Sequence, residues 1–321
     1  MTRLSGITPS GDIHLGNYLG AVRRWAAEAG PGDLYFVSDL HAMTLAHEPK
    51  RLRSGTRQLL AVMLAAGVPA DSLFVQSDLV REHMALTWLL ECTCTFGEAQ
   101  RMIQFKEKGA GRESVRLSLL TYPVLMAADI LLHGTEEVPV GEDQRQHVEL
   151  ARTLAQRFNS TYGEVFVVPR GVLPAAAARV RDLADPTRKM SKSSAEGNGV
   201  VYLLDPPEVV RRKFRRAVTD NLGEVRYDPE GQPGVANLLE ILAACTGVTP
   251  ERAAAGLGSY RELKEATAEA VLAELGPVRE RTAELLADTA ELDAVRAAGA
   301  ELARERCGKR LDAALAAAGL G

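Results

Sequence analysis

Residues 4–17 read LSGITPSGDIHLGN, and this stretch joins a β-prone run to a turn and to the start of a helical pattern. The run at 4–7 is short, the turn contains Pro9 and Gly11, and helical spacing begins near residue 17. A strand that leads through a tight turn into a helix is the repeating unit of open parallel sheets. The N–H groups at such a helix start are unpaired and attract anions.

The same alternation continues through the first half of the chain. Four further β-prone runs lie at 34–37, 73–76, 138–140 and 165–168. Helical patterns lie at about 17–29, 50–66, 81–95, 117–132 and 143–158. Alternating strands and helices predict an α/β fold with a Rossmann-like parallel sheet that is covered by helices on both faces. We expect this domain to span 1–185, with a helical insertion at about 98–135.

From residue 186 onward, β-prone runs nearly disappear. The stretch 234–318 is rich in Ala, Leu, Glu and Arg at helical spacing, with expected breaks at Gly247, Pro250, Gly256, Gly258 and Pro277. We therefore expect an all-helical domain at 186–321, appended to the sheet domain.

The charge balance excludes a protein that binds nucleic acid through a global positive field. The 321 residues carry a net charge of −4, from 38 basic and 42 acidic side chains. An RNA ligand would have to meet local basic patches, for which the candidates are RRKFRR at 211–216 and the stretch 304–310. For both patches, a solvated helix face is an equally good interpretation.

Cysteine usage and hydropathy predict a cytoplasmic protein. Cys92, Cys94, Cys245 and Cys307 form neither a paired metal-binding motif nor the dense pattern of a secreted disulfide scaffold. The N-terminus has no apolar signal-peptide core, and no stretch approaches the ~18 apolar residues of a membrane span.

Two motifs carry groups suited to a polyphosphate. His14, Gly16 and Asn17 stand at the first helix start, where donors and a close backbone approach are available to phosphate oxygens. The second motif, KMSKS at 189–193, places two lysines among small hydroxyl residues. Each motif alone also suits a capped turn or a solvated linker. Their co-occurrence in this order favours a phosphate site.

The two motifs resemble the HIGH and KMSKS signatures of class I aminoacyl-tRNA synthetases. Further blocks resemble those of the bacterial-type tryptophanyl-tRNA synthetases: SGITPSG at 5–11, TYPVLMAADILL at 121–132, PVGEDQRQHVELAR at 139–152, DPTRKMSKS at 185–193, AVTD at 217–220 and PGVANLL at 233–239. The resemblance implies a ligase that activates L-tryptophan with ATP, releases pyrophosphate, and transfers tryptophan to tRNA(Trp). It also implies that 186–321 contains the KMSKS loop and the tRNA anticodon-binding domain.

Asp129 is the residue that the resemblance places at the indole N–H. A single carboxylate in an apolar helix is costly unless it has a partner, and a site built around such a hydrogen bond rejects ligands that lack the donor by ~10⁴ or more. The resemblance places six other residues around the indole or the amino group: His41, Tyr122, Met126, Val138, Val140 and Gln144. For the three apolar ones among them, an ordinary core position is nearly as good an interpretation.

The resemblance assigns the remaining site residues to ATP. It implies catalytic roles for His14, Asn17, Lys108, Lys189 and Lys192, where Lys108 lies in a charged, glycine-punctuated stretch that we expect to be a surface loop. It implies nucleotide contacts for Thr8, Pro9, Ser10, Gly16, Asn17, Gly141, Glu142, Asp143, Val180, Lys189, Met190, Ser191, Lys192 and Ser193. Mg²⁺ is expected on the phosphate oxygens and not on a protein ligand set. The resemblance also implies a homodimer, with apolar helices near 84–95 as the candidate interface.

Two positions depart from the family pattern. Thr8 stands where the common bacterial pattern has Gln, and Ser38 replaces a position that is usually apolar. We hypothesise a variant copy whose pocket tolerates inhibitors that mimic tryptophan. The alternatives are tyrosyl specificity on the same scaffold, a nucleotidylyltransferase with a related turn, and a catalytically silent synthetase paralogue that binds RNA or tryptophan.

Overall fold

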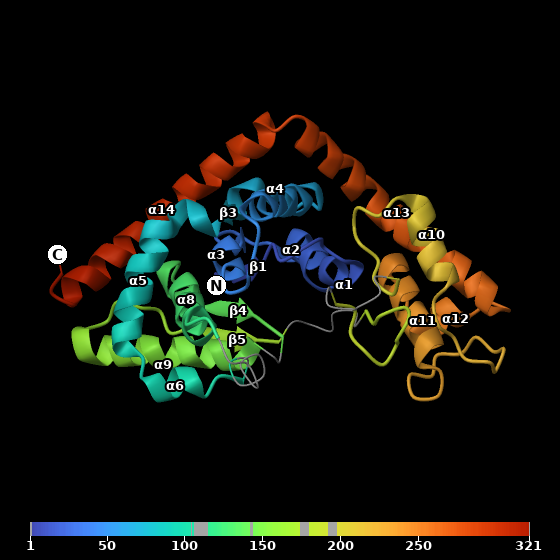
Figure 1. The fold of residues 1–321 in the computed structure, drawn as a ribbon, viewed down its shortest axis with the longest axis horizontal. Coiled ribbons are helices and arrows are strands. Elements are labelled where there is room, and N and C mark those ends of the chain that lie inside the picture. Colours follow the sequence, from blue (N-terminus) through green and yellow to red (C-terminus); the bar gives the residue numbers. More distant parts are fainter. Residues whose placement is uncertain are drawn as a thin grey trace.

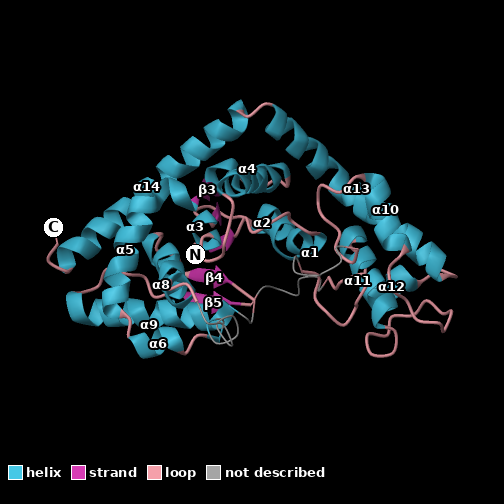
Figure 2. Cartoon of the chain, viewed as in Figure 1, coloured by secondary structure: helices cyan, strands magenta, loops and turns pink. Residues whose placement is uncertain are grey.

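The computed structural model describes residues 2–103, 105, 115–141, 144–173, 180–191 and 198–320, in which helices surround a small central sheet (Figures 1 and 2). The strands are β1 (Leu4–Ile7), β2 (Leu34–Val37), β3 (Leu73–Val75), β4 (Glu137–Pro139) and β5 (Arg170–Val172). The α-helices are α1 (Leu15–Asn17), α2 (Arg23–Glu28), α3 (Asp39–Ala42), α4 (Pro49–Ala65), α5 (Val80–Thr93), α6 (Phe96–Gln100), α8 (Ser118–Leu132), α9 (Arg145–Tyr162), α10 (Pro207–Arg215), α11 (Pro233–Thr246), α12 (Pro250–Ala254), α13 (Tyr260–Ala287) and α14 (Ala290–Ala317). The other short helices are the π-helix η1 (Tyr18–Val22) and the 3-10 helices η2 (Ala70–Ser72) and η3 (Gln76–Leu79).

The strands confirm the predicted parallel sheet. β1, β2 and β3 pair in parallel in that order, and β4 pairs in parallel with β5. A parallel bridge between Arg3 and Glu137 connects β1 to β4, so the strands follow the order 3-2-1-4-5. This is the order of the Rossmann fold, in which ligands bind beyond the carboxyl ends of the strands.

The alternation of side chains along β2 explains why helices cover both faces of the sheet. Tyr35 and Val37 belong to one apolar cluster, with residues of α4, α11 and α13. Leu34 and Phe36 belong to a second cluster, with residues of α5, α8, α9 and α14. Because successive side chains of a strand point to opposite faces, both faces of β2 are buried.

The strand predicted at 165–168 is wrong, because the fifth strand is Arg170–Val172. The side chain of Asn159 explains the difference. Its Oδ1 accepts the N–H groups of Val165 and Phe166 at 3.1 and 2.9 Å, and its Nδ2 donates to the Phe166 carbonyl at 2.8 Å. The backbone of this apolar segment is thus satisfied by a side chain and does not need a neighbouring strand.

The predicted break at Pro277 is also wrong, because Pro277 lies inside the continuous helix α13. Proline in a helix interior costs about 3 kcal/mol or more. Val271, Leu275 and Val278 are buried on the same helix, and burying each such side chain stabilises the fold by about 1.5–3 kcal/mol. The chain instead turns at residues 288–289, between the two long helices that meet at the top of Figure 1.

The last helix, α14, runs back to the sheet domain and lies beside α5 (Figure 1). Its residues Ala300, Ala303 and Cys307 are buried in the cluster that contains Phe36 and Phe74. The helical part that the sequence delimits as 186–321 therefore includes a helix that packs on the sheet.

All four cysteines carry free thiols. Within the described ranges, no helix has the length and apolarity needed to cross a membrane.

We predict that Gly299→Ala lowers the midpoint of urea unfolding, because a Cβ at Gly299 would lie 1.7 Å from the carbonyl oxygen of Leu73 in β3. We expect a loss of about 1–3 kcal/mol in the free energy of unfolding, as for other overpacked sites. Gly308→Ala on the same helix is the control, since a Cβ there has no atom within 4 Å. This control should be stabilised by about 0.5–1 kcal/mol. Equal stability of the two variants would contradict the packing argument.

Candidate functional site

A cavity of about 590 Å³ opens beyond the carboxyl ends of β1 and β2. All the residues that the resemblance places around the indole contribute to its lining: His41, Tyr122, Met126, Asp129, Val138, Val140 and Gln144. From the predicted nucleotide side, Thr8, Ser10 and Gly141 line the same cavity. The structure thus brings together groups from four separate segments of the chain.

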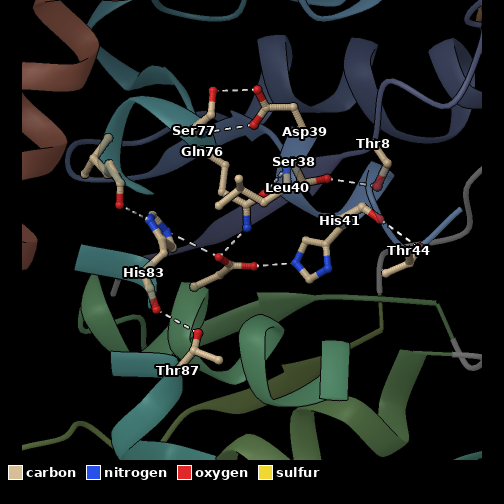
Figure 3. Close-up of polar contacts among 12 residues, drawn as sticks. Thr8, Ser38, Asp39, Leu40, His41, Thr44, Gln76, Ser77, His83 and Thr87 are labelled. Carbon is tan, nitrogen blue, oxygen red and sulfur yellow. Dashed lines mark hydrogen bonds and ion pairs between the residues drawn. The ribbon is translucent and has the colours of Figure 1, made fainter. Parts of the chain in front are cut away.

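Asp129 is buried, with a side-chain exposure of 3%, and has polar partners from three other elements. His41 Nε2 of α3 lies 2.8 Å from Asp129 Oδ2, and Gln76 Nε2 of η3 donates to Asp129 Oδ1 at 2.7 Å. His83 Nε2 of α5 lies 3.3 Å from Oδ1. Figure 3 shows the side chains of His41, Gln76 and His83 pointing toward one another. These partners offset the cost of burying the carboxylate.

Sequence reasoning missed Gln76. This residue is fully buried directly after β3, and its Oε1 accepts the N–H of Leu40 at 3.0 Å while its Nε2 holds Asp129. It therefore links the ends of β2 and β3 to α8. The only sequence signal was the need of a buried Asp129 for partners.

A second buried carboxylate stabilises the same edge of the sheet. Asp39 accepts the N–H and the hydroxyl of Ser77 at 3.0 and 2.6 Å (Figure 3). Burial raises the pKa of the Asp39 carboxyl, and the two bonds from Ser77 act in the opposite direction. Asp39 does not line the cavity, so its contacts indicate a structural role.

Tyr122 lines the cavity and is held by His147, which lies behind it. The Tyr122 hydroxyl lies 2.9 Å from His147 Nε2, and the rings of Tyr122 and His41 meet edge to face with centroids 6.2 Å apart. His147 is almost fully buried in α9, so the tyrosine ring is held from behind. The aromatic wall of the cavity is therefore positioned by side chains of two helices.

The turn at residues 14–17 and the segment before KMSKS lie side by side. His14 caps α1, with its Nδ1 accepting the Asn17 N–H at 3.3 Å. A Cβ at Gly16 would lie 3.5 Å from the Val180 Cβ, and Met190 N donates to the Val180 carbonyl at 3.1 Å. The two motifs, far apart in the sequence, thus meet around Val180, as a shared phosphate site requires.

Asn237 of α11 supports this segment and was not singled out from the sequence. Its Oδ1 accepts the N–H of Arg181 at 2.9 Å, and its Nδ2 donates to the Arg181 carbonyl at 3.1 Å. It is 2% exposed, so both bonds are shielded from water. Asn237 therefore holds the backbone next to Val180 to the helical part of the chain.

Other predicted nucleotide residues have different positions. Pro9 is buried and Ser191 is half-buried. Lys189 has an exposed side chain, and its backbone forms an isolated antiparallel β-bridge with that of Arg181. Five predicted site residues lie outside the described residues: Lys108, Glu142, Asp143, Lys192 and Ser193. Their assignments stay predictions.

The two departures from the family pattern touch each other. Thr8 Oγ1 lies 2.9 Å from Ser38 Oγ, and both residues line the cavity (Figure 3). Thr8 follows β1 and Ser38 follows β2, so the contact joins the carboxyl ends of two adjacent strands. The cavity wall therefore carries a pair of hydroxyl groups that position each other.

The two basic patches differ in how far their charges are already engaged. In 211–216, Arg211 pairs with Glu269 at 2.7 Å and Lys213 with Asp205 at 2.6 Å, while Arg212, Arg215 and Arg216 are exposed. In 304–310, the side chains contact the chain itself: Arg304 donates to the Asp78 carbonyl, Arg306 to Gly32, Lys309 to Glu305 and Arg310 to Leu132. Apart from the Lys309–Glu305 pair, which lies within α14, these contacts hold α14 against the rest of the chain. An RNA contact of the first patch stays a prediction.

Comparisons with known proteins agree with this geometry. Residues 1–276 match the family model described as tRNA synthetases class I (W and Y). The chain is 56% identical to "Tryptophan--tRNA ligase 1" of Streptomyces coelicolor, covering 100% of this chain and 98% of that protein. It is 54% identical to the protein of the same name from Streptomyces avermitilis, covering 98% of each.

Solved structures are similar over the whole chain. The tryptophanyl-tRNA synthetase of Mycoplasma pneumoniae has a TM-score of 0.89 at 37% identity, covering 100% of this chain and 98% of that one. The enzyme of Campylobacter jejuni, solved with ADP and tryptophan, has a TM-score of 0.85 at 31% identity, covering 100% of both chains. A tyrosyl-tRNA synthetase of Aeropyrum pernix, at 23% identity and a TM-score of 0.68, shares the fold.

The Rossmann-type sheet, the paired motifs and the match over residues 1–276 define the class: the chain belongs to the class I tRNA synthetases of the W and Y family. Within this family, the relatives that are 56% and 54% identical are both tryptophan–tRNA ligases by name.

Proposed function

We infer that the chain is a tryptophan–tRNA ligase, which activates L-tryptophan with ATP and transfers it to tRNA(Trp). The observation that carries this inference is Asp129, a buried carboxylate in the wall of an otherwise largely apolar and aromatic cavity. An acceptor in such a wall suits an indole, which is a large apolar ring with one N–H donor. The full-length similarity to tryptophan–tRNA ligases supports the same substrate and disfavours tyrosyl specificity.

The mechanism we propose is in-line attack of the tryptophan carboxylate on the α-phosphate of ATP. The carboxylate is already ionised near neutral pH, so the step needs no general base. Charge develops on the departing pyrophosphate, and Lys189, Lys192, His14 and Asn17 are placed by sequence and motif to stabilise it. Holding both substrates in one orientation supplies most of the remaining acceleration.

We propose that Mg²⁺ enters with ATP, on its phosphate oxygens. Among the described residues, no group of three or more His, Cys, Asp or Glu side chains could hold a metal ion. Magnesium in nucleotide sites is commonly held by substrate phosphates and water with one or two protein groups, so a protein cage is not needed. Bound Mg²⁺ would neutralise phosphate charge.

We predict that Asp129→Asn lowers kcat/KM for tryptophan in ATP–pyrophosphate exchange by about tenfold to hundredfold, because a hydrogen bond to a charged acceptor contributes about 1.5–3 kcal/mol. All twenty amino acids should be tested as substrates of the unmodified protein, which is the parent of the variants. Asp39→Asn is the control, since Asp39 is also a buried carboxylate but does not line the cavity. The control should keep the preference for tryptophan. Exchange with tyrosine alone would overturn the assignment, and no exchange at all would favour a silent paralogue.

We propose that two copies of the chain associate through the outer face of α5. Val80, Met84 and Trp88 recur at helical spacing on this face, and Trp88 is 64% exposed. The opposite face of the same helix is buried against α8. An exposed apolar stripe on a well-packed helix is typical of an interface.

We predict that the parent sediments with twice the chain mass of 34.6 kDa, and that Trp88→Lys shifts it toward the single chain by placing a charge in the apolar contact. Leu222→Lys is the control, because Leu222 is similarly exposed at 62% but lies in the helical part of the chain. A parent that is monomeric at micromolar concentration, or an unaffected Trp88→Lys variant, would argue against this interface.

We propose that the Thr8–Ser38 pair makes this a variant enzyme that tolerates inhibitors mimicking tryptophan. The two hydroxyls are engaged with each other at 2.9 Å at the cavity wall. The Gln of the common pattern is longer and carries an amide that can both donate and accept hydrogen bonds. An inhibitor that depends on this amide would lose a partner here.

We predict that an indole-based analogue inhibits the parent about tenfold less than it inhibits the Thr8→Gln variant, as expected for one lost hydrogen bond. The measurement is the inhibition constant in ATP–pyrophosphate exchange. Thr8→Val, which removes only the hydroxyl, should stay as tolerant as the parent. Equal inhibition of the parent and Thr8→Gln would refute the proposal.

A further inference from the structure

His83 is a buried histidine with both ring nitrogens next to an acceptor. It lies in the first turn of α5 and is fully buried. Its Nδ1 lies 2.9 Å from the carbonyl oxygen of Leu79, and its Nε2 lies 3.3 Å from Asp129 Oδ1. Within the described part of the chain, Nε2 makes no hydrogen bond, and the Asp129 carboxylate lies within ion-pair distance of it.

The chemistry of these two acceptors determines where protons must lie. A backbone carbonyl can only accept, so Nδ1 carries a hydrogen. If the ring were neutral, the lone pair on Nε2 would then face the carboxylate, and two buried acceptors would repel each other. In the other neutral tautomer, which carries its proton on Nε2, the Nδ1 lone pair would face the carbonyl oxygen of Leu79. A proton on Nε2 as well as on Nδ1 turns the approach to Asp129 into an ion pair and leaves the contact with Leu79 intact.

Among the charged groups around His83, Asp129 is the one that can pair with a protonated His83 ring. A ring that carries both protons is an imidazolium, and the Asp129 carboxylate at 3.3 Å is its counter-charge. His133, whose ring centroid is 6.0 Å away, is buried, and this burial lowers its pKa well below the usual range, so it is neutral. Arg304, Arg306 and Arg310 of α14 donate to backbone carbonyls and keep their positive charges, so none of them compensates an imidazolium. Asp129 is therefore the partner that compensates an imidazolium.

We propose that His83 is a positioning residue for tryptophan selection: its ring pairs with Asp129 Oδ1 and fixes the orientation of the carboxylate, so that Oδ2 faces the substrate. Gln76 and His83 occupy Oδ1, and His41 occupies one side of Oδ2. A carboxylate has about four acceptor sites, which leaves one on Oδ2 for the indole N–H. The proposal rests on the role proposed above for Asp129.

The test compares tryptophan with an isostere in which sulfur replaces the indole N–H, 3-(benzothiophen-3-yl)alanine. Preference is the ratio of the two kcat/KM values in ATP–pyrophosphate exchange. His83→Met keeps the volume but removes the donor, and we expect the preference to fall about tenfold or more, through KM for tryptophan and not through kcat. His83→Gln keeps an N–H that can reach Oδ1 and should retain the preference within about threefold.

His133→Met is the matched control, because it removes a neighbouring buried imidazole that has no contact with Asp129. Its preference should equal that of the parent. A His83→Met enzyme with the parent's preference, or a His133→Met enzyme that loses as much, would overturn the proposal. Asp129→Asn distinguishes a failure of this proposal from a failure of the proposed role of Asp129. If Asp129→Asn keeps the preference for tryptophan, the role of Asp129 is wrong. If Asp129→Asn loses the preference and His83→Met keeps it, only the role of His83 is wrong.

A measurement on the unmodified protein covers the case in which His83→Met does not fold. Two-bond ¹H–¹⁵N correlation spectra distinguish protonated from unprotonated ring nitrogens. We expect both nitrogens of His83 to carry protons near neutral pH, while His133 shows one. An unprotonated Nε2 in His83 would overturn the proposal whatever the variants do.

Discussion

The burial of one carboxylate constrains much of the site. Asp129 is 2% exposed, and an unpaired charge in such a place costs several kcal/mol. Its partners come from α3, η3 and α5, which follow β2 and β3 at their carboxyl ends. The parallel order 3-2-1-4-5 places these ends along one edge. The adjacency of β2 and β3 therefore brings the partners of Asp129 together, and the cavity forms where this edge of the sheet meets α8.

Much of the fold follows from local patterns. The runs at 4–7, 34–37 and 73–76 are strands as predicted, apart from residue 76, and the side chains of the second and third run suit burial on both faces. The errors arose where a distant or neighbouring group changed the balance. At 165–168, the side chain of Asn159 replaced a strand partner, and at Pro277 the buried face of α13 outweighed a missing hydrogen bond. Local secondary-structure propensity includes neither of these two effects.

The site was predictable to the extent that its residues share a motif. Asp129 and Met126 lie in one block, and the apolar context of Asp129 indicated that it needs partners. Gln76 and His83 could not be chosen as those partners from the sequence, because the contacts connect residues 53 and 46 positions apart along the chain. A glutamine after a strand and a histidine in a helix are compatible with many surroundings, and only the packing of α5 against α8 selects this one.

The C-terminal helix shows why a basic stretch cannot be assigned from composition. Arg296 pairs with Asp78 through two bonds of 2.8 and 2.7 Å, and Arg310 donates to the carbonyl of Leu132 at the end of α8. Helix ends leave carbonyl groups without partners, and a guanidinium with five donors satisfies them well. Asp78 lies two residues after Gln76, and Leu132 three residues after Asp129. The arginines of α14 therefore hold the two elements that carry the carboxylate and its amide partner, so the geometry of the cavity depends on residues at the far end of the sequence.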